Sequence, residues 1–309
     1  MDHKLYLSDP GIYRLRNDFY YFKNKRNVTD LKILNRLSKF VVPPAWKNVW
    51  YASNPKCHIQ VYGTDVGNKK QYILSEKWVK NSRSEKFNRM KKFIKDLNSF
   101  KKKIKLKSIL LNRETLIHLL FNLLIDLHIR VGNEIYVPNS YGLTTLRQKH
   151  LKNNQLKFIG KSNIEHIIDI PPEYIPWFQK LQNVRSKVTF GKNSPLFHYT
   201  EGGNGIISSE ELNVYLKENM GKEYTCKDFR TYSANMLFIK SFLKNCKSNL
   251  IQKKIVLKSI DESAKQLGHT RSICRKSYIS NNLLDYCIDS FDEASLLSPG
   301  ELLSKVWSS

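Results

Sequence analysis

The chain contains five residues of types that could act together at an anionic centre: Arg130, Lys161, Arg230, His269 and Tyr278. Two guanidinium groups, an ammonium group and an imidazole can neutralise an anion, and a tyrosine hydroxyl can act as a nucleophile beside them. Taken singly, each residue also has an ordinary explanation: a surface arginine, a solvated turn lysine, an arginine paired with a carboxylate, a capping histidine and a core tyrosine. Their chemistry therefore depends on whether the fold brings them together.

The segment from His269 to Tyr278 carries the most informative spacing. The two residues are nine positions apart, which places them on opposite faces of a continuous helix of about 3.6 residues per turn. They can converge only across a break in the helix. Gly268 can end one helix and Thr270 can cap the next, so the sequence predicts this break beside His269.

Two other kinds of site have little support in the sequence. The run Gly160–Ser162 resembles the end of a P-loop, but Gln155 occupies the position of the earlier glycine, and a strand is expected where a helix should follow. His166 and His198 have no second ligand at metal-binding spacing, and the sequence contains no HExxH motif. We therefore expect neither a nucleotide cofactor nor a metal ion.

The net charge of the chain indicates a polyanionic partner. The 309 residues include 52 Lys and Arg against 27 Asp and Glu, for a formal net charge of +25 and a pI of about 9.7. Hydrophobic residues make up 41% of the chain and charged residues 26%, which is typical of a globular protein and excludes disorder over most of the length. Folding alone does not require so large a charge, which repels itself in the compact state.

The cysteines and the apolar segments bear on the cellular compartment. The five cysteines are an odd number without a CxxC pair, and the opening MDHKLYLSDPG does not resemble a secretory signal. The longest apolar stretches, such as HLLFNLLIDLHI, are interrupted well before the ~18 residues that a membrane span needs. We therefore expect a reduced, intracellular protein that does not cross a membrane.

The first eighty or so residues alternate aromatic and β-branched segments with turn signals, which predicts a small sheet. The expected strands are Tyr6–Leu15, Phe19–Phe22, Val49–Ala52, His58–Tyr62 and Gln71–Leu74. Between the second and third strands, Thr29 is expected to cap a short helix that presents Leu31, Leu34 and Leu37. A hairpin turn at Gly67 and Asn68 is expected to carry Lys69, Lys70, Gln71 and Tyr72.

From about Lys80 the pattern becomes helical, so we place a domain boundary near Asn81 and Ser82. Apolar spacing predicts one helix through Phe87, Met90, Ile94 and Leu97, and a second from Leu116 to Leu127 that Gly132 should terminate. Strands at Leu156–Ile159 and Ile164–Ile168 should be joined by a tight turn, with mainly helices after Pro172. The prediction is an α+β protein with a small β-rich N-terminal domain, residues 1–81, and a larger, mostly α-helical domain, residues 82–309.

The five candidate residues lie in short motifs: Arg130 in IRVGNE, Lys161 in FIGKS, Arg230 in KDFRTY, His269 in LGHT and Tyr278 in KSYI. In residue types, order and spacing this set resembles the active site of the type IB DNA topoisomerases, particularly the small poxvirus-type and bacterial enzymes. The segments VVPPAWKNVW, GNKKQY and YGLTTLRQKHL are also similar to segments of that family. The resemblance covers roughly residues 40 to 280 and implies a tyrosine-recombinase-like catalytic domain.

The resemblance implies relaxation of supercoiled duplex DNA by transient cleavage of one strand. Tyr278 would be the nucleophile and form a 3′-phosphotyrosine, while Arg130, Arg230 and His269 would neutralise charge on the nonbridging oxygens. Lys161 would be the general acid that protonates the leaving 5′-oxygen. Because one linkage is exchanged for another, resealing would require neither ATP nor metal.

The resemblance also implies how the chain meets its partner, duplex DNA. The family segment that enters the major groove resembles Lys69, Lys70, Gln71 and Tyr72, although these residues could also form an ordinary hairpin, and Lys227 is a further DNA-binding candidate. We expect a monomer that closes as a clamp on opposite sides of the duplex. A large DNA virus or a bacterium is the implied source, with action in a virus factory, a virion or the bacterial cytoplasm.

Two alternative functions remain open at this point. A tyrosine recombinase shares the cation-rich site, but it usually has a histidine three residues before the second arginine, where this chain has Lys227. The N-terminal half also carries PPAW and KKQY segments in place of a recombinase core-binding domain. The other alternative is a noncatalytic DNA-binding protein. Relaxation of a supercoiled plasmid distinguishes the three, because recombination needs a synaptic tetramer and an architectural protein cuts nothing.

Overall fold

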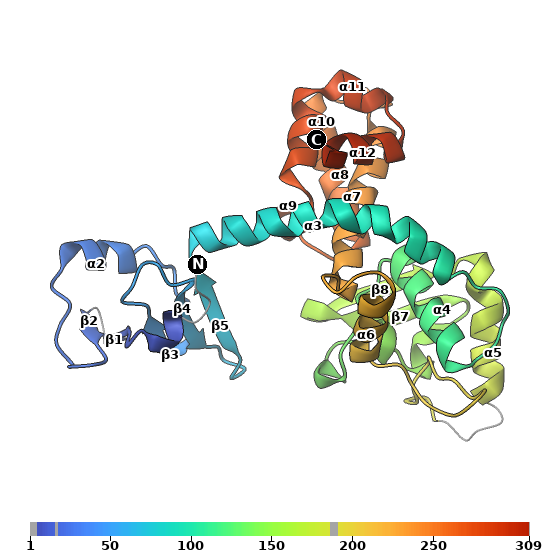
Figure 1. The fold of residues 1–309 in the computed structure, drawn as a ribbon, viewed down its shortest axis with the longest axis horizontal. Helices are drawn as coiled ribbons and strands as arrows, with labels where there is room; N and C mark the ends of the chain where they lie inside the picture. The colour runs from blue at the N-terminus through green and yellow to red at the C-terminus, as the bar shows by residue number, and fades with distance from the viewer. Residues whose placement is uncertain (1–4, 16–17, 186–190, 309) are drawn as a thin grey trace. The chain divides into compact units, whose positions relative to one another are not determined.

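The computed structural model describes residues 5–15, 18–185 and 191–308 and divides into two compact units, Met1–Phe87 and Asn88–Ser309 (Figure 1). The division falls inside helix α3 (Glu76–Lys103), the helix that also contains the boundary expected near Ser82. The first unit contains a five-stranded sheet, and the second is mostly helical with a three-stranded sheet. The predicted α+β class is therefore confirmed.

The sheet of the first unit is antiparallel throughout, with the strand order β2-β1-β3-β4-β5. Its strands lie close to the predicted segments: β1 (Ile12–Leu15), β2 (Asp18–Tyr21), β3 (Lys47–Tyr51), β4 (Ile59–Thr64) and β5 (Lys70–Leu74). Ile12, Tyr51 and Val61 are buried against Leu37 of helix α2 (Leu31–Leu37). The β4–β5 hairpin turns at Asn68, which has a φ of +56°, as the sequence predicts.

Two local predictions for this unit are wrong. The segment expected to begin the first strand forms the short helix α1 (Leu5–Ser8), because the Asp9 carboxylate accepts a hydrogen bond from the Gly11 N–H and turns the chain before β1. Helix α2 is capped by Asp30 and not by Thr29. The Asp30 carboxylate accepts hydrogen bonds from two N–H groups of the first helical turn, which is the usual role of an N-cap residue.

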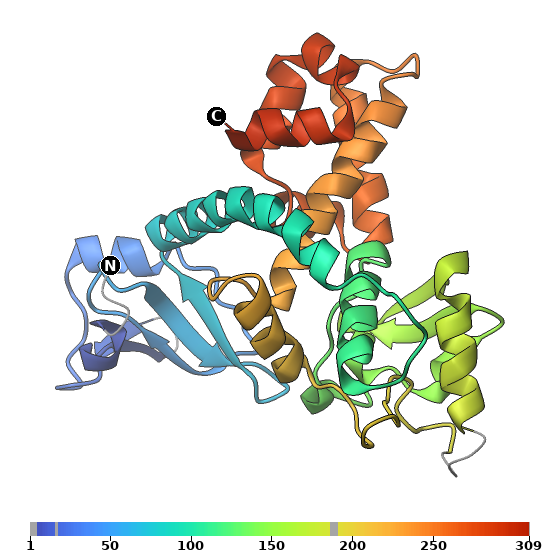
Figure 2. The same ribbon diagram turned by 45° about the vertical axis from the view of Figure 1, so that its right-hand side comes forward.

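The second unit has one continuous hydrophobic core built around helix α4 (Arg113–Asp126). Its other long helices are α5 (Ile175–Arg185), α6 (Ser209–Asn219), α7 (Cys226–Asn245) and α8 (Gln252–Gln266). Shorter helices follow to the C-terminus: α9 (Arg271–Ser277), α10 (Asn281–Asp289), α11 (Phe291–Leu296) and α12 (Pro299–Ser308). Helices α10, α11 and α12 pack against α7 and α8 (Figure 2), so the predicted helical remainder of the chain is confirmed.

The three-stranded sheet of the second unit has the order β6-β7-β8 and consists of β6 (Leu151–Lys152), β7 (Gln155–Gly160) and β8 (Ile164–Asp169). Strands β7 and β8 form the predicted hairpin, with the 3-10 helix η4 (Lys161–Asn163) as its turn. The remaining 3-10 helices are η1 (Glu134–Tyr136), η2 (Leu143–Thr145), η3 (Gln148–His150) and η5 (Pro172–Tyr174). Lys161, the first residue of η4, therefore lies at the turn of the β7–β8 hairpin.

Helix α3 buries Met90 and Leu97, as the apolar spacing predicts. The other two predicted positions, Phe87 and Ile94, are only partly buried, and Phe93 and Phe100 complete the buried stripe instead. The rings of Phe93 and Phe100 pack edge-on against aromatic residues of α7 and α4, respectively. The buried face of α3 is therefore rotated relative to the expected face, toward the aromatic residues of α7 and α4.

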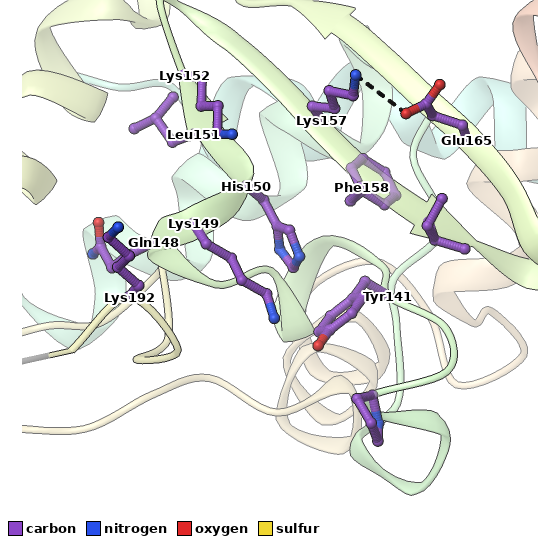
Figure 3. A pocket seen from close by; sticks show the side chains of 12 residues that line it. Tyr141, Gln148, Lys149, His150, Leu151, Lys152, Lys157, Phe158, Glu165 and Lys192 are labelled. Carbon is purple, nitrogen blue, oxygen red and sulfur yellow. Dashed lines mark ion pairs between the residues drawn. The ribbon is translucent and has the colours of Figure 1, made fainter.

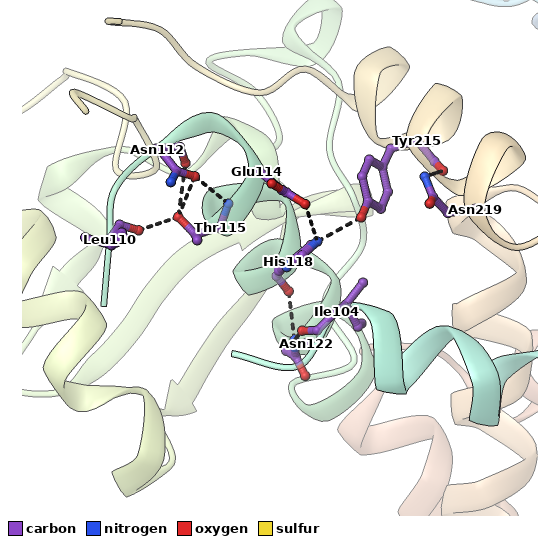
Figure 4. A network of polar contacts seen from close by, with 9 residues as sticks. All are labelled: Ile104, Leu110, Asn112, Glu114, Thr115, His118, Asn122, Tyr215 and Asn219. Atoms are coloured by element: carbon purple, nitrogen blue, oxygen red, sulfur yellow. Dashed lines mark hydrogen bonds and ion pairs between the residues drawn. The ribbon is translucent and has the colours of Figure 1, made fainter. Parts of the chain in front are cut away.

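Polar contacts hold helix α4 in place at its partly exposed side (Figure 4). The imidazole Nε2 of His118 lies 2.8 Å from the hydroxyl of Tyr215 in α6. The Asn122 amide donates hydrogen bonds to the carbonyls of Ile104 and His118, both at 2.8 Å. The contacts with Tyr215 and Ile104 tie α4, the helix before Arg130, to α6 and to the segment after α3.

The end of α4 differs from the prediction. The helix stops at Asp126, and His128, at a φ of +55°, turns the chain before Gly132 is reached. Gly132 has a different role, because its backbone packs directly on Gly142. A Cβ atom at Gly142 would lie 2.5 Å from the Gly132 Cα and 2.7 Å from the Arg130 carbonyl oxygen. The loop that carries Arg130 is therefore held against a position where only glycine fits.

We predict that Gly142→Ala lowers the free energy of unfolding by about 1–3 kcal/mol, because the added methyl group meets backbone atoms that cannot rotate away. Gly142 has a φ of −147°, which alanine adopts easily, so the contact alone causes the loss. The measurement is urea denaturation followed by circular dichroism. Gly300→Ala is the matched control, since no atom lies within 4 Å of the corresponding Cβ and stability should not fall. Equal stability of the Gly142 variant and the wild type would contradict the contact.

Candidate active site

Four of the five predicted residues meet around helix α7. Arg230 lies near the start of α7, and Arg130 follows the end of α4. His269 lies in the connection between α8 and α9, and Tyr278 is the C-cap residue of α9. Four separate stretches of sequence therefore contribute to one site, each of them near a helix end.

The predicted break between α8 and α9 is confirmed. Gly268, at a φ of +59°, follows the end of α8, and the Thr270 hydroxyl accepts a hydrogen bond from the N–H of Ile273 as the cap of α9. The break brings the rings of His269 and Tyr278 into a stack, with centroids 4.5 Å apart and an interplanar angle of 21°. The nine-residue spacing is thus converted into direct contact.

Arg230 is almost fully buried, with 6% of its surface exposed. Its Nη1 donates to the carbonyl of His128 and its Nη2 donates to the carbonyl of Leu267. Burial, together with the charge of Arg130, lowers the pKa of Arg230 to about 10, so the guanidinium still carries its charge at neutral pH. The guanidinium is consequently held in one orientation by two main-chain oxygens.

His269 lies between the two guanidinium groups. Its Nδ1 is 3.4 Å from Nη2 of Arg130, and its Nε2 is 3.3 Å from Nη2 of Arg230. Burial and the charges of Arg230 and Arg130 lower the pKa of His269 to about 3. The imidazole is therefore neutral at pH 7, where it carries one N–H donor. The site concentrates positive charge and donors around one small region, an arrangement suited to a phosphate group.

Two residues that sequence reasoning missed hold the predicted ones in place. The Asn235 amide of α7 donates to the Tyr278 carbonyl at 3.0 Å, and its Oδ1 accepts from the Ser280 N–H at 2.9 Å. The Nδ1 of His128 lies 2.9 Å from the Ser233 hydroxyl, also on α7. Neither contact has a local sequence signal, because each joins positions more than forty residues apart along the chain.

Lys161 is exposed at the turn of the β7–β8 hairpin, while the other four residues are at least partly buried. The backbone before Lys161 lies beside the backbone before His269, because Gly160 and Gly268 both pack against the ring of His166 on β8. The structure therefore brings Arg130, Arg230, His269 and Tyr278 into contact and presents Lys161 beside them on a separate element.

The predicted DNA-binding residues fall into different settings. Lys70 and Tyr72 share the exposed face of β5, and the Lys70 ammonium lies 4.3 Å from the ring centroid of Tyr62. Gln71 faces the other way and donates to the Asp65 carboxylate at 2.7 Å. Lys69 is exposed at the hairpin turn, and Lys227 is exposed at the start of α7. The four hairpin residues thus do not form one surface.

A pocket of about 650 Å³ opens beside the β7–β8 hairpin (Figure 3). It is lined by four lysines, Lys149, Lys152, Lys157 and Lys192. One of them is paired, since Lys157 lies 3.3 Å from the Glu165 carboxylate. None of the five predicted catalytic residues lines this pocket, so it adds positive charge near the hairpin without belonging to the site.

Within the described ranges, no cluster of three or more His, Cys, Asp or Glu side chains has the arrangement of a metal site. The helices of the same ranges also include none with the combined length and apolar character of a membrane span. All five cysteines are unpaired thiols, four of them buried.

Comparison with known proteins identifies the family. A family model described as eukaryotic DNA topoisomerase I, catalytic core, matches residues 75–293, and one described as bacterial DNA topoisomerase IB, N-terminal domain, matches residues 18–65. DNA topoisomerase 1B of Acanthamoeba polyphaga mimivirus is 35% identical over 302 residues, which cover 89% of this chain and 87% of that protein. DNA topoisomerase 1B of vaccinia virus (strain Copenhagen) is 28% identical over 267 residues, 79% of this chain and 78% of that protein. The chain therefore belongs to the type IB DNA topoisomerases, enzymes that relax supercoiled DNA, and is of the small type found in poxviruses, mimivirus and bacteria.

Proposed function

We propose that this type IB topoisomerase relaxes duplex DNA through a covalent bond between Tyr278 and the 3′ end of one transiently cleaved strand. The Tyr278 oxygen attacks the phosphorus, and the bond from phosphorus to the 5′-oxygen breaks. The free 5′-hydroxyl later attacks the phosphotyrosine and restores the strand. One phosphoester replaces another in each step, so the cycle uses neither ATP nor a metal ion. The stacking of Tyr278 on His269, which lies between Arg130 and Arg230, is the observation that supports this proposal.

The two arginines and His269 neutralise the charge that grows on the nonbridging oxygens as Tyr278 attacks. Planar guanidinium groups suit this role because they donate paired hydrogen bonds to phosphate oxygens. Arg230 is fixed by two carbonyls before the DNA arrives, so it loses little freedom when the transition state forms. The neutral His269 adds one donor without adding to the repulsion between the arginines.

Lys161 supplies the proton for the leaving 5′-oxygen. An alkoxide is a poor leaving group at neutral pH, and a positioned acid lowers this barrier. Lys161 is suited to the task because it is exposed at the end of a hairpin whose backbone lies beside the turn that carries His269. The nucleophile and the acid therefore approach the phosphate from different elements of the fold.

The partner is duplex DNA, which we propose is bound by a monomer that contacts it with both units. In the N-terminal unit, Lys70 and Tyr72 present a cation and an aromatic ring on one strand face, with Lys69 at the adjoining turn. Gln71 joins them only if its amide leaves Asp65. Lys227 places a further cation three residues before Arg230. The formal charge of +25 supplies the general attraction for the phosphate backbone.

We predict that the purified protein relaxes supercoiled plasmid in EDTA without ATP, and that Tyr278→Phe abolishes both relaxation and the covalent protein–DNA adduct. Phenylalanine keeps the ring that stacks on His269 and removes only the nucleophilic oxygen, so affinity for DNA should stay within a few-fold of wild type. The measurements are gel-based relaxation, denaturing-gel detection of the adduct and a mobility-shift titration. An adduct that persists in the variant would require another nucleophile.

We predict that a sulfur substitution separates the role of Lys161 from that of Arg230. A thiol has a pKa of about 8.5, against about 15.7 for water, so a 5′-thiolate leaves with little help from an acid. Lys161→Ala should cleave ordinary DNA slowly and a 5′-bridging phosphorothiolate at nearly the wild-type rate. Arg230→Ala should stay slow on both, because the nonbridging charge is unchanged. Single-turnover cleavage tests this, and equal rescue of both variants, or of neither, would remove the acid role from Lys161.

We predict that Lys70→Ala weakens DNA binding and reduces the slope of log affinity against log salt by about 1, as loss of one phosphate contact requires. The matched control is Lys305→Ala, because the Lys305 ammonium is 2.8 Å from the Glu293 carboxylate and should not contribute to the slope. Fluorescence anisotropy over a range of salt concentrations measures both values. An unchanged slope for the Lys70 variant would place this residue outside the interface.

A further inference from the structure

His166 packs against the backbone on both sides of the active site. A Cβ atom at Gly160 would lie 2.7 Å from His166 Nε2, and a Cβ atom at Gly268 would lie 2.7 Å from His166 Cε1. Gly160 directly precedes Lys161, and Gly268 directly precedes His269. One imidazole ring therefore touches the two backbone segments from which two of the predicted catalytic side chains emerge.

The ring is itself held in place. It stacks on Phe158 of the paired strand β7, with centroids 5.0 Å apart and an interplanar angle of 17°. Phe158 is buried in the core of the second unit, so the stack is anchored to the body of that unit. Burial and the charges of Arg230 and Arg130 lower the pKa of His166 to about 4. The ring is therefore neutral at pH 7, so it contacts the two glycines by packing and not by charge.

We propose that His166 is a positioning residue that seats the Lys161 hairpin against the turn carrying His269. With this contact, the Lys161 ammonium and the His269–Tyr278 pair are aligned on the same phosphate. Without it, the hairpin loses the imidazole contact with the turn and keeps the Ile164 side chain near Gly268, which leaves the acid misplaced. The inference rests on the proposed roles of Tyr278 and Lys161, and it assigns no chemical step to His166.

The phosphorothiolate substrate distinguishes positioning of the acid from a general structural role. His166→Ala should slow single-turnover cleavage of ordinary DNA by up to about 100-fold, the loss expected when a catalytic group moves by about 1 Å. On 5′-bridging phosphorothiolate DNA it should cleave within a few-fold of wild type, since that substrate does not need the acid. Ile167→Ala is the matched control on the same strand, because Ile167 faces the opposite side and is 56% exposed. It should be normal on both substrates.

A second variant tests the contact itself. Gly160 has a φ of −98° and a ψ of −167°, an extended conformation that alanine adopts freely, so Gly160→Ala should act only through its collision with the His166 ring. It should reproduce the selective slowing on ordinary DNA. In the His166→Ala background the ring is gone, so adding Gly160→Ala should cost far less than it does in the wild type. Strictly additive losses would overturn the proposal.

The outcomes separate this inference from the proposed function. Wild-type protein and Tyr278→Phe are assayed in parallel, and absence of an adduct with the wild type would refute the covalent mechanism. If the wild type cleaves, then normal rates for His166→Ala, or equal slowing on both substrates, would overturn the inference alone. If circular dichroism shows that His166→Ala does not fold, Gly160→Ala, which keeps the histidine, replaces it in the test. It should then cleave ordinary DNA slowly and phosphorothiolate DNA near the wild-type rate, and equal rates on both would overturn the inference.

Discussion

The burial of the Arg230 guanidinium between two helix ends is the constraint on which the site depends. A buried cation needs acceptors, and here they are the carbonyls of His128, just beyond α4, and of Leu267, the C-cap of α8. Helix C-termini have unpaired carbonyls and partial negative charge, so they stabilise a guanidinium without a carboxylate. In each of these two segments a site residue follows two positions later: Arg130 after His128, and His269 after Leu267.

This use of backbone oxygens explains how the site stays positively charged. The acidic residue nearest to Arg230 in sequence is Asp228, which is buried but turned away from the site. Its carboxylate pairs with Arg89 of α3 at 2.9 Å and accepts a hydrogen bond from the Thr225 N–H at the start of α7. Carbonyl acceptors fix a guanidinium without cancelling its charge, whereas a carboxylate would compete with phosphate. The positive charges of Arg130 and Arg230 therefore remain available to a DNA phosphate.

Sequence patterns predicted the structure correctly where a feature is caused by residues close together in the sequence. The break at Gly268 and Thr270 and the β7–β8 hairpin depend on residues a few positions apart, and both are confirmed. The predictions failed where a contact between distant parts of the sequence determines the role of a residue. Gly132 was expected to end α4, yet it is needed for its packing on Gly142. His166 looked like an isolated histidine in sequence, because its contacts come from a neighbouring strand and from a turn about one hundred residues away.

The site also divides its residues between a rigid helix, α7, and a separate hairpin, β7–β8. Arg230 and the Asn235 amide, which donates to the Tyr278 carbonyl, lie on the same helix, α7, so the proposed nucleophile and its proposed charge-stabilising partner are aligned by one rigid element. Lys161 is carried by the β7–β8 hairpin, which meets the His269 turn through His166 and Ile164. In the proposed reaction the phosphotyrosine is retained while the 5′ strand departs and returns. A rigid helix suits the retained end, and a separate hairpin suits the proposed acid, which acts only when the departing strand is in place.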